Sequence, residues 1–204
     1  GRLLAEYATE KRIFVPREAM PRRVVQAFLA AEDKNFYQHP GVDFMSVVRA
    51  IITNVDNYRR GRRFQGASTI TQQVAKNFLL TNEVSLERKV KEAILAFRIE
   101  RAFTKDQILE LYLNEIFLGF SSYGVAAASL NYYNKSLPEL TIADVAYLAA
   151  LPKGPNNYHP IRNPDAALAR RNWVLDRMLE EGYVSPQEAI EAKAQPIEIR
   201  RRDN

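Results

Sequence analysis

The feature that most restricts the fold is a succession of helical segments, each with apolar residues at the helical period and a capping residue before it. Pro21 suits the first position of a helix that runs to Glu32, and apolar residues from Phe44 to Tyr58 predict a second helix. The residues that can cap the later helices are hydroxyls and one amide: Ser68 or Thr69, Ser85, Thr104, Thr141, Asn163 and Ser185. The pattern predicts a mainly α fold, with at most a small strand element in the first twenty residues.

Two of the predicted helices carry apolar residues that bear on function. The helix over 85–102 is expected to bury one apolar side. That side carries Val90, Ile94, Phe97 and Ile99. The helix over 44–58 is instead followed by a group of arginines, and an apolar face next to arginines suits an anionic bilayer interface. Those arginines are Arg59, Arg60, Arg62 and Arg63, in a predicted loop. Periodicity does not separate interfacial docking from packing inside the domain.

The chain is basic, with a net charge of +5 and a pI near 9.4, which implies an anionic partner. Nucleic acid, an acidic membrane surface and a phosphate-bearing substrate all satisfy this requirement. The sequence has no cysteine, so disulfides and thiolate zinc sites are excluded, and its two histidines are too few for a histidine-based metal cluster. It has no run of eighteen uncharged apolar residues, so we expect no membrane span within it.

The first candidate site is a carboxylate followed by aromatic residues and a turn. Glu32 and Asp33 stand at a helix end, and Phe36, Tyr37 and His39 follow. In a cleft, partial desolvation would raise the pKa of Glu32, as a general base for a sugar hydroxyl requires. The alternative is a solvated acidic helix end. Asp33 is equally suited to hydrogen bonding at a turn, and His39 to a buried position in a loop.

The second candidate site is a polar helix. Ser68 lies near its start, where free backbone N–H groups can face an anion. Gln73, Lys76 and Asn77 are three and four positions apart, so they share one face of the helix. An ammonium group and two amides on one face suit a diphosphate and sugar hydroxyls. The alternative is a capped surface helix with an ordinary polar stripe.

The third candidate site is a charged group on the next helix. Arg88 and Lys89 are four and three positions before Glu92. The two cations can neutralise a departing pyrophosphate, while Glu92 orients them or contacts substrate. The alternative is a solvated ion-pair face, which stabilises a helix by only about a few tenths of a kcal/mol.

In order and spacing, these segments resemble the glycosyltransferase domain of class A penicillin-binding proteins and of monofunctional peptidoglycan glycosyltransferases. The motifs that carry the resemblance extend over nearly the whole chain: residues 32–41, 66–77, 88–92, 105–114, 155–160 and 170–175. The resemblance implies a single domain over 1–204 with a lysozyme-like, two-lobed helical fold, whose smaller, membrane-proximal lobe lies around 44–65. Glu110 and Asn114 resemble residues that support this architecture.

The resemblance also implies a reaction. Lipid II is polymerised into β-1,4-linked glycan strands, and undecaprenyl diphosphate is released. Glu32 corresponds to the general base that acts on the acceptor 4-hydroxyl, and Glu92 joins it in the implied catalytic set. The residues implied at the donor and phosphoglycolipid-inhibitor site are Ser68, Gln73, Lys76, Asn77, Arg88 and Lys89. The cations among them would stabilise the leaving diphosphate.

The implied partners are lipid II, the growing lipid-linked glycan chain, an anionic membrane surface, inhibitors of the moenomycin type and other cell-wall synthesis proteins, but no nucleic acid. No metal site and no tightly bound cofactor are expected, with Mg²⁺ or Mn²⁺ at most assisting at the diphosphate. We expect a bacterial inner-membrane protein with its catalytic domain on the outer, periplasmic face. Its N-terminal anchor helix, and a C-terminal penicillin-sensitive transpeptidase domain, are expected outside this sequence.

Two rival hypotheses come from other classes of protein. One is a lytic, glycan-cleaving enzyme of lysozyme-like fold, in which Glu32 acts as a general acid. Lys76, Arg88 and Lys89 argue against it, because a neutral glycan linkage has no diphosphate to neutralise. The other is a helical nucleic-acid-binding module, which leaves the glutamine-rich helix and Glu32 unexplained.

Overall fold

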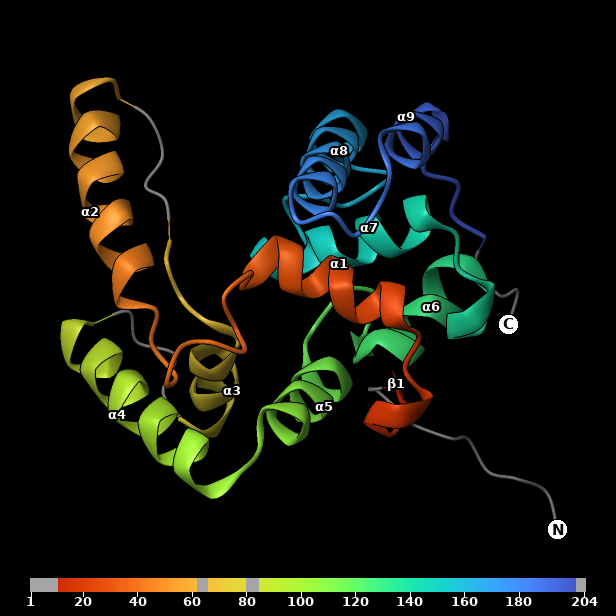
Figure 1. Ribbon diagram of the computed structural model, residues 1–204. Helices are drawn as coiled ribbons and strands as arrows, with labels where there is room; N and C mark the ends of the chain where they lie inside the picture. The colour runs from red at the N-terminus through yellow and green to blue at the C-terminus, as the bar shows by residue number, and fades with distance from the viewer. Residues whose placement is uncertain (1–10, 62–65, 80–84, 201–204) are drawn as a thin grey trace, which may run out of the picture. The chain divides into compact units, whose positions relative to one another are not determined.

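The chain divides into two compact units. The residues described in the computed structural model are 11–61, 66–79 and 85–200. One unit combines the residues before Glu32 with those from Leu113 onward, and the other runs from Glu32 to Tyr112. The boundaries fall within α1 (Arg22–Glu32) and α5 (Lys105–Glu115), both of which are labelled in Figure 1.

The first unit is built around α7 (Ile142–Ala150), in which nearly every residue is buried. Its sequence is alanine-rich and apolar on all sides, which is typical of a helix enclosed by other helices. α8 (Pro164–Glu180) packs along α7, and α9 (Pro186–Ala194) packs against both. α6 (Val125–Tyr133) also contacts α7, and α1 contributes a buried apolar face to the core of this unit.

Two short strands belong to the first unit. β1 (Lys11–Arg12) pairs in parallel with β2 (Ser122–Tyr123), with Lys11 opposite Ser122. Three 3-10 turns occur in the described residues: Arg17–Ala19, Leu137–Glu139 and Leu151–Lys153. The mainly α fold and the small strand element near the start of the chain are therefore both confirmed.

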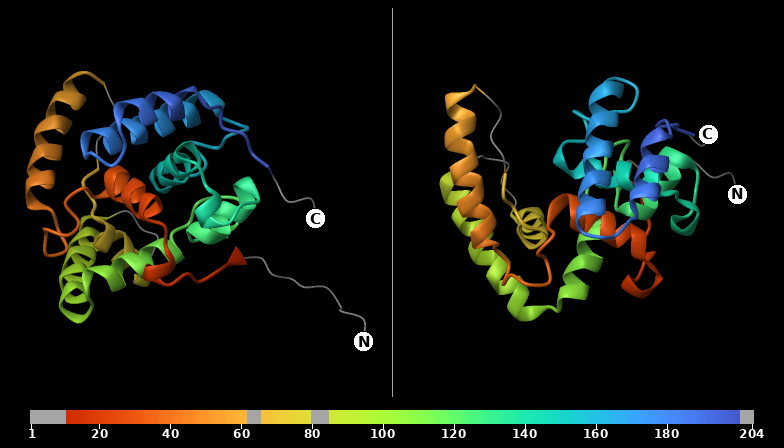
Figure 2. Two further views of the ribbon diagram at one scale, coloured as in Figure 1. Left: turned by 45° about the vertical axis from the view of Figure 1, so that its right-hand side comes forward. Right: turned by 45° about the horizontal axis from the view of Figure 1, so that its top comes forward.

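The second unit contains α2 (Phe44–Arg59), α3 (Ile70–Phe78), α4 (Leu86–Ala102) and most of α5. α3 packs against α4, and both views of Figure 2 show the two helices side by side. Ile70, Val74 and Ala75 of α3 are buried.

The predicted caps are confirmed at most helix starts. Thr69, rather than Ser68, caps α3 and forms a capping box with Gln72. The caps of the other confirmed helices are Ser85, Thr104, Thr141 and Ser185. Asn163 precedes α8 but makes no capping hydrogen bond, because its amide donates to Asn156 O at 3.0 Å instead.

The prediction for the buried side of α4 is wrong in part. Val90 and Ile94 are 52% and 49% exposed, Phe97 is half-buried, and only Ile99 of the predicted set is buried. The side that α4 does bury carries Arg88, Glu92, Ala96 and Ile99. The helix is rotated relative to the prediction, so that Arg88 and Glu92 are enclosed together with Ala96 and Ile99, while Val90 and Ile94 are exposed.

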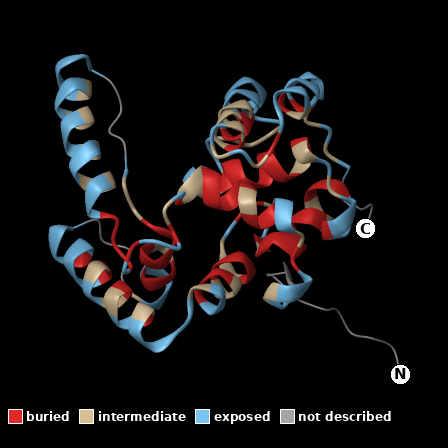
Figure 3. Ribbon diagram, in the orientation of Figure 1, coloured by how far each residue is buried: buried red, intermediate tan, exposed pale blue. Residues whose placement is uncertain are grey.

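α2 is exposed along its whole length. None of its residues is buried, and the Phe44 ring stacks on that of Phe97 of α4, with centroids 6.2 Å apart. Ile52 is 67% exposed, and Figure 3 shows the helix in the colours of exposed and intermediate residues. The alternative that this apolar face packs inside the domain is therefore wrong. Among the described residues, no helix combines the length and apolar character needed to cross a membrane.

Candidate active site

Glu32 is the last residue of α1, and the buried apolar face of that helix fixes the helix end. The Glu32 side chain is half-buried, and its Oε2 accepts a hydrogen bond from Gln73 Nε2 at 3.0 Å. Gln73 belongs to α3 and is far along the chain from Glu32. The structure therefore brings together residues of the first and second predicted sites.

The Gln73 amide has a second contact that sequence analysis missed. The hydroxyl of Tyr112, on α5, donates to Gln73 Oε1 at 3.3 Å. Tyr112 is 1% exposed; burial raises its pKa well above the usual value, and the negative charges of Glu32 and Asp33 raise it further. A tyrosine on the apolar face of a helix could have indicated this contact, because a buried phenol needs a hydrogen-bond partner.

Asp33 and His39 form a buried pair beside Glu32 in the sequence. Asp33 Oδ2 lies 2.7 Å from His39 Nε2 and also accepts from the backbone N–H of Ile70 at 2.9 Å. Gly41 N donates to His39 Nδ1 at 3.0 Å, so Nδ1 carries no proton and Nε2 donates to Asp33. Asp33 thus sits at the positive N-terminal end of α3. Asp33 therefore hydrogen-bonds at a turn and His39 is buried in a loop, as the sequence analysis considered for each.

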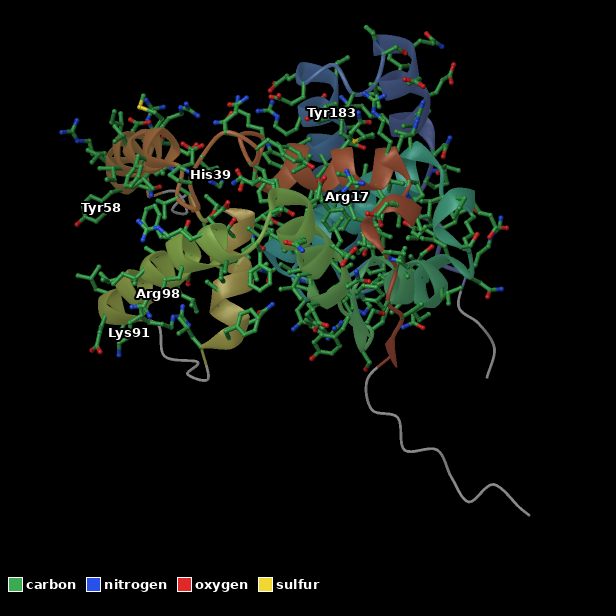
Figure 4. The ribbon with its side chains drawn as sticks, turned by 60° about the horizontal axis from the view of Figure 1, so that its bottom comes forward. Arg17, His39, Tyr58, Lys91, Arg98 and Tyr183 are labelled. Atoms are coloured by element: carbon green, nitrogen blue, oxygen red, sulfur yellow. The ribbon has the colours of Figure 1, made fainter. Side chains whose placement is uncertain are left out.

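The loop that carries His39, labelled in Figure 4, is fixed against α3 and α4 by Gly41. Gly41 has φ +111°, and a Cβ there would lie 3.1 Å from the Ala96 carbonyl. Its own carbonyl accepts a hydrogen bond from Thr69 Oγ1 at 2.6 Å. Glycine is required at this position both for the backbone conformation and for the close approach to α4.

Lys105 of α5 provides a second attachment for the same loop. Its Nζ donates to His39 O and to Glu100 Oε1, each at 2.7 Å, and lies 4.5 Å from the centre of the Phe36 ring. Thr71 Oγ1 also donates to Glu100 Oε1, at 2.6 Å. The segment after Glu32 is therefore connected to α3, α4 and α5.

In the third predicted site, Lys89 contacts both Glu92 and Ser68. Lys89 Nζ donates to Ser68 Oγ at 3.0 Å and to Glu92 Oε1 at 2.7 Å. The Lys89 side chain is half-exposed, whereas Glu92 is 1% exposed. This geometry suits Glu92 as the residue that orients Lys89; its assignment to the catalytic set stays a prediction.

The remaining predicted site residues lie on the same two helices. Lys76 and Asn77 are exposed on α3, and Arg88 is buried on α4. Of the two residues expected to support the architecture, Asn114 bonds both backbone groups of Val15, at 2.8 and 2.9 Å, within the first unit. Glu110 is half-buried on α5.

Comparison with known proteins decides the family. Residues 1–179 match the protein family described as "Transglycosylase". The chain belongs to this transglycosylase family. The chain is thus a glycosyltransferase domain, and the relatives described next confirm the predicted resemblance to that domain of class A penicillin-binding proteins.

Relatives of this transglycosylase share the name penicillin-binding protein 1A. The protein from Rickettsia felis is 58% identical over 99% of the chain and 26% of its own length. Those from Aquifex aeolicus and Escherichia coli K12 are 51% and 47% identical, over 98% and 97% of the chain and 27% and 23% of their lengths. The transglycosylase chain thus spans about a quarter of these relatives.

A solved structure supports the fold of the transglycosylase. The crystal structure of penicillin-binding protein 1A from Haemophilus influenzae matches it with a TM-score of 0.59 and 30% identity. The match covers 100% of this chain and 20% of that one.

Proposed function

We propose that this transglycosylase polymerises lipid II into β-1,4-linked glycan strands and releases undecaprenyl diphosphate. The observation that carries the proposal is the arrangement along α3: Gln73 contacts the Glu32 carboxylate, and Ser68, just before the helix, contacts Lys89. One helix thus connects a candidate base with a candidate cation for the leaving group. The relatives are named penicillin-binding proteins, which agrees with a cell-wall substrate.

Glu32 acts in this proposal as the general base. A sugar hydroxyl is a poor nucleophile at neutral pH, so a carboxylate that takes its proton during attack accelerates the reaction. The half-buried position of Glu32 at a helix end permits contact with a substrate while limiting its exposure to water. A single carboxylate suffices, because direct displacement by the acceptor 4-hydroxyl inverts the donor and needs no second carboxylate as nucleophile.

The leaving group in this proposal is stabilised by positive charge. A diphosphate leaves readily once its charge is neutralised, and Lys76, Arg88 and Lys89 supply that charge without a general acid. Ser68, Gln73 and Asn77 provide hydrogen bonds to the same substrate, and to phosphoglycolipid inhibitors. Mg²⁺ or Mn²⁺ would at most assist at the diphosphate, and the described residues include no group of three or more acidic or histidine side chains that could hold a metal ion.

Docking on a membrane is the second part of the proposal. A lipid-linked substrate has to be taken from a bilayer, and α2 offers an exposed face for contact with it. The apolar side chains exposed on that face are Phe44, Met45, Val48, Ile51, Ile52, Val55 and Tyr58. Arg59 and Arg60 are exposed at its end, and Figure 4 shows Lys91 and Arg98 projecting outward from α4. Apolar and cationic groups on one unit suit an anionic membrane surface, on the outer face of the inner membrane.

The experiment that tests the reaction compares two substrates. Purified lipid II and isolated cell-wall sacculi are incubated separately with the full-length protein, and the products are separated by size. We expect polymer from lipid II and no soluble fragments from sacculi. The lytic alternative is supported instead if sacculi are cleaved and lipid II is left unchanged.

A further inference from the structure

α4 carries an apolar stripe, Leu86, Val90 and Ile94, on a side that α3 does not cover. These residues are 83%, 52% and 49% exposed, and they stand four positions apart, so they lie along one side of the helix. The side that packs against α3 is a different one, on which Arg88 and Glu92 are buried. Large apolar side chains in line on an exposed helix face indicate contact with an apolar ligand or surface.

The two ends of the stripe have different neighbours. At its start, Leu86 is three positions before Lys89, so the two side chains are neighbours on the helix surface. Lys89 Nζ in turn donates to Ser68 Oγ at 3.0 Å, just before α3. Beyond the other end, the half-buried Phe97 ring stacks on Phe44 of α2, with centroids 6.2 Å apart. The stripe therefore runs from a candidate diphosphate cation to an aromatic pair.

We propose that the stripe holds the prenyl chain of the lipid-linked substrate, with the diphosphate of the same molecule at Lys89; this site rests on the proposed function, in which Lys89 stabilises the leaving diphosphate. A polyprenyl diphosphate has a charged head joined directly to a hydrocarbon chain, so a site for it needs a cation beside an apolar track. An α-helix rises about 1.5 Å per residue, so the track from Leu86 to Ile94 is about 12 Å long. That length accommodates more than one isoprene unit of the chain.

The width of the stripe favours a single chain over a bilayer. α2 exposes apolar side chains over a wide face, which suits insertion into lipid. On α4, charged residues border the stripe: Glu87 and Lys91, which pair at 2.5 Å, on one side and Lys89 on the other. Figure 4 shows Lys91 projecting outward from the helix. Insertion of this side of α4 into a bilayer would carry the Glu87–Lys91 pair into hydrocarbon, at a desolvation cost that a single bound chain avoids.

Val90→Ser combined with Ile94→Ser removes the apolar surface and keeps the helix. Serine has a helix propensity close to those of valine and isoleucine. Both replaced side chains are about half-exposed, so Tm should change little. The hydrogen-bond partners of Lys89 are Ser68 and Glu92, which the variant leaves in place. The double variant therefore changes the track without changing the cation beside it.

The test measures binding of undecaprenyl diphosphate and of inorganic diphosphate to the full-length protein in the same detergent. The two ligands share the charged group, and only one has a chain. We expect the α4 double variant to bind undecaprenyl diphosphate about tenfold more weakly than the wild type, because apolar surface buried against the chain is lost. Its affinity for inorganic diphosphate should be unchanged. Lys89→Gln should weaken binding of both ligands, since the charged group is common to them.

A matched control makes the same kind of change on α2. Ile51→Ser combined with Ile52→Ser should keep the affinity for undecaprenyl diphosphate in detergent, whereas the α4 double variant should keep the affinity for anionic vesicles. Unchanged binding of undecaprenyl diphosphate to the α4 double variant would overturn the inference. A simultaneous loss of vesicle binding would then assign the stripe to the bilayer, and a loss of self-association would assign it to a second copy of the chain.

Binding is measured without turnover, so its outcome is separate from that of the proposed function. Should the wild type fail to polymerise lipid II while the α4 double variant loses undecaprenyl diphosphate, the proposed function fails and the chain site stands. Polymerisation by the wild type, with equal undecaprenyl diphosphate binding in both proteins, gives the reverse result. Should the double variant fail to fold, Leu86→Ser decides by the same comparison, since that position is 83% exposed.

Discussion

Glu92 could either orient a cation or transfer a proton to the substrate, and its burial and its contact with Lys89 distinguish these roles. Its side chain is enclosed and bonded to Lys89, which suits orientation of the cation better than proton transfer to a substrate. Glu92→Gln should therefore lower kcat by about tenfold, against about a thousandfold for loss of the general base. Initial rates of lipid II polymerisation measure both.

A matched control for this variant lies on the same helix. Glu87 is exposed and pairs with Lys91 at 2.5 Å, so Glu87→Gln removes a helical carboxylate without disturbing Lys89. It should leave the rate unchanged. Equal losses in Glu92→Gln and Glu32→Gln would contradict the orienting role and indicate that both carboxylates take part in the chemistry.

Asp43 caps α2 and makes its first turn sensitive to pH. Burial alone would raise the pKa of Asp43, but hydrogen bonds from Ser46 and Asn35 outweigh it and lower the pKa from 3.8 to about 2. Because the pKa is lower in the folded state, the stabilisation is complete above the unfolded value of 3.8 and is lost as the pH falls toward 2.

Asp43→Ala should therefore speed hydrogen exchange in the first turn of α2 at neutral pH. The expected factor is about fivefold, which corresponds to about 1 kcal/mol for a lost cap. Protection factors for wild type and variant should converge between pH 4 and pH 2, around the two pKa values. Asp56→Ala, at an exposed position of the same helix, is the control. A difference that persists undiminished at low pH would contradict the assignment.

At the scale of elements, α2 is a helix whose apolar face has no core to enter. Ile51→Ser combined with Ile52→Ser should lower affinity for anionic vesicles about tenfold, because buried apolar area is lost from the membrane contact. It should leave Tm unchanged, since neither side chain is buried. Vesicle sedimentation measures the affinity. Ile190→Ser, at a similarly exposed apolar position on α9, should not affect binding. Unchanged binding in the α2 variant would contradict docking through this face.

Within an element, features that depend on neighbouring residues in the sequence were predicted, and features that depend on tertiary contacts were not. Thr69, Ser85 and Thr141 cap helices through residues three positions away, so their pattern is visible along the chain. The orientation of α4 is different in kind. Its period is local, but the enclosure of Arg88 and Glu92, with Val90 and Ile94 left exposed, depends on packing against α3, which no short pattern contains.

At the scale of the whole chain, the order of motifs predicted the family and the candidate site, whereas the contacts within that site were not predictable. Glu32 and Gln73 were expected in one site because of that order, and their hydrogen bond agrees. Tyr112 lies within the motif at 105–114, but no role was predicted for it. Its hydroxyl reaches Gln73 only after α5 is placed against α3, which is a property of the folded chain.

The most direct test of the proposed reaction is polymerisation of lipid II by the wild type and by Glu32→Gln. The change removes the proton acceptor while keeping the size of the side chain and its position beside Gln73. Product length and initial rate are measured for equal amounts of folded protein. We expect a loss of about a thousandfold or more, because a general base supplies a factor of that order. Substantial polymer from Glu32→Gln would contradict the assignment of Glu32 as the base.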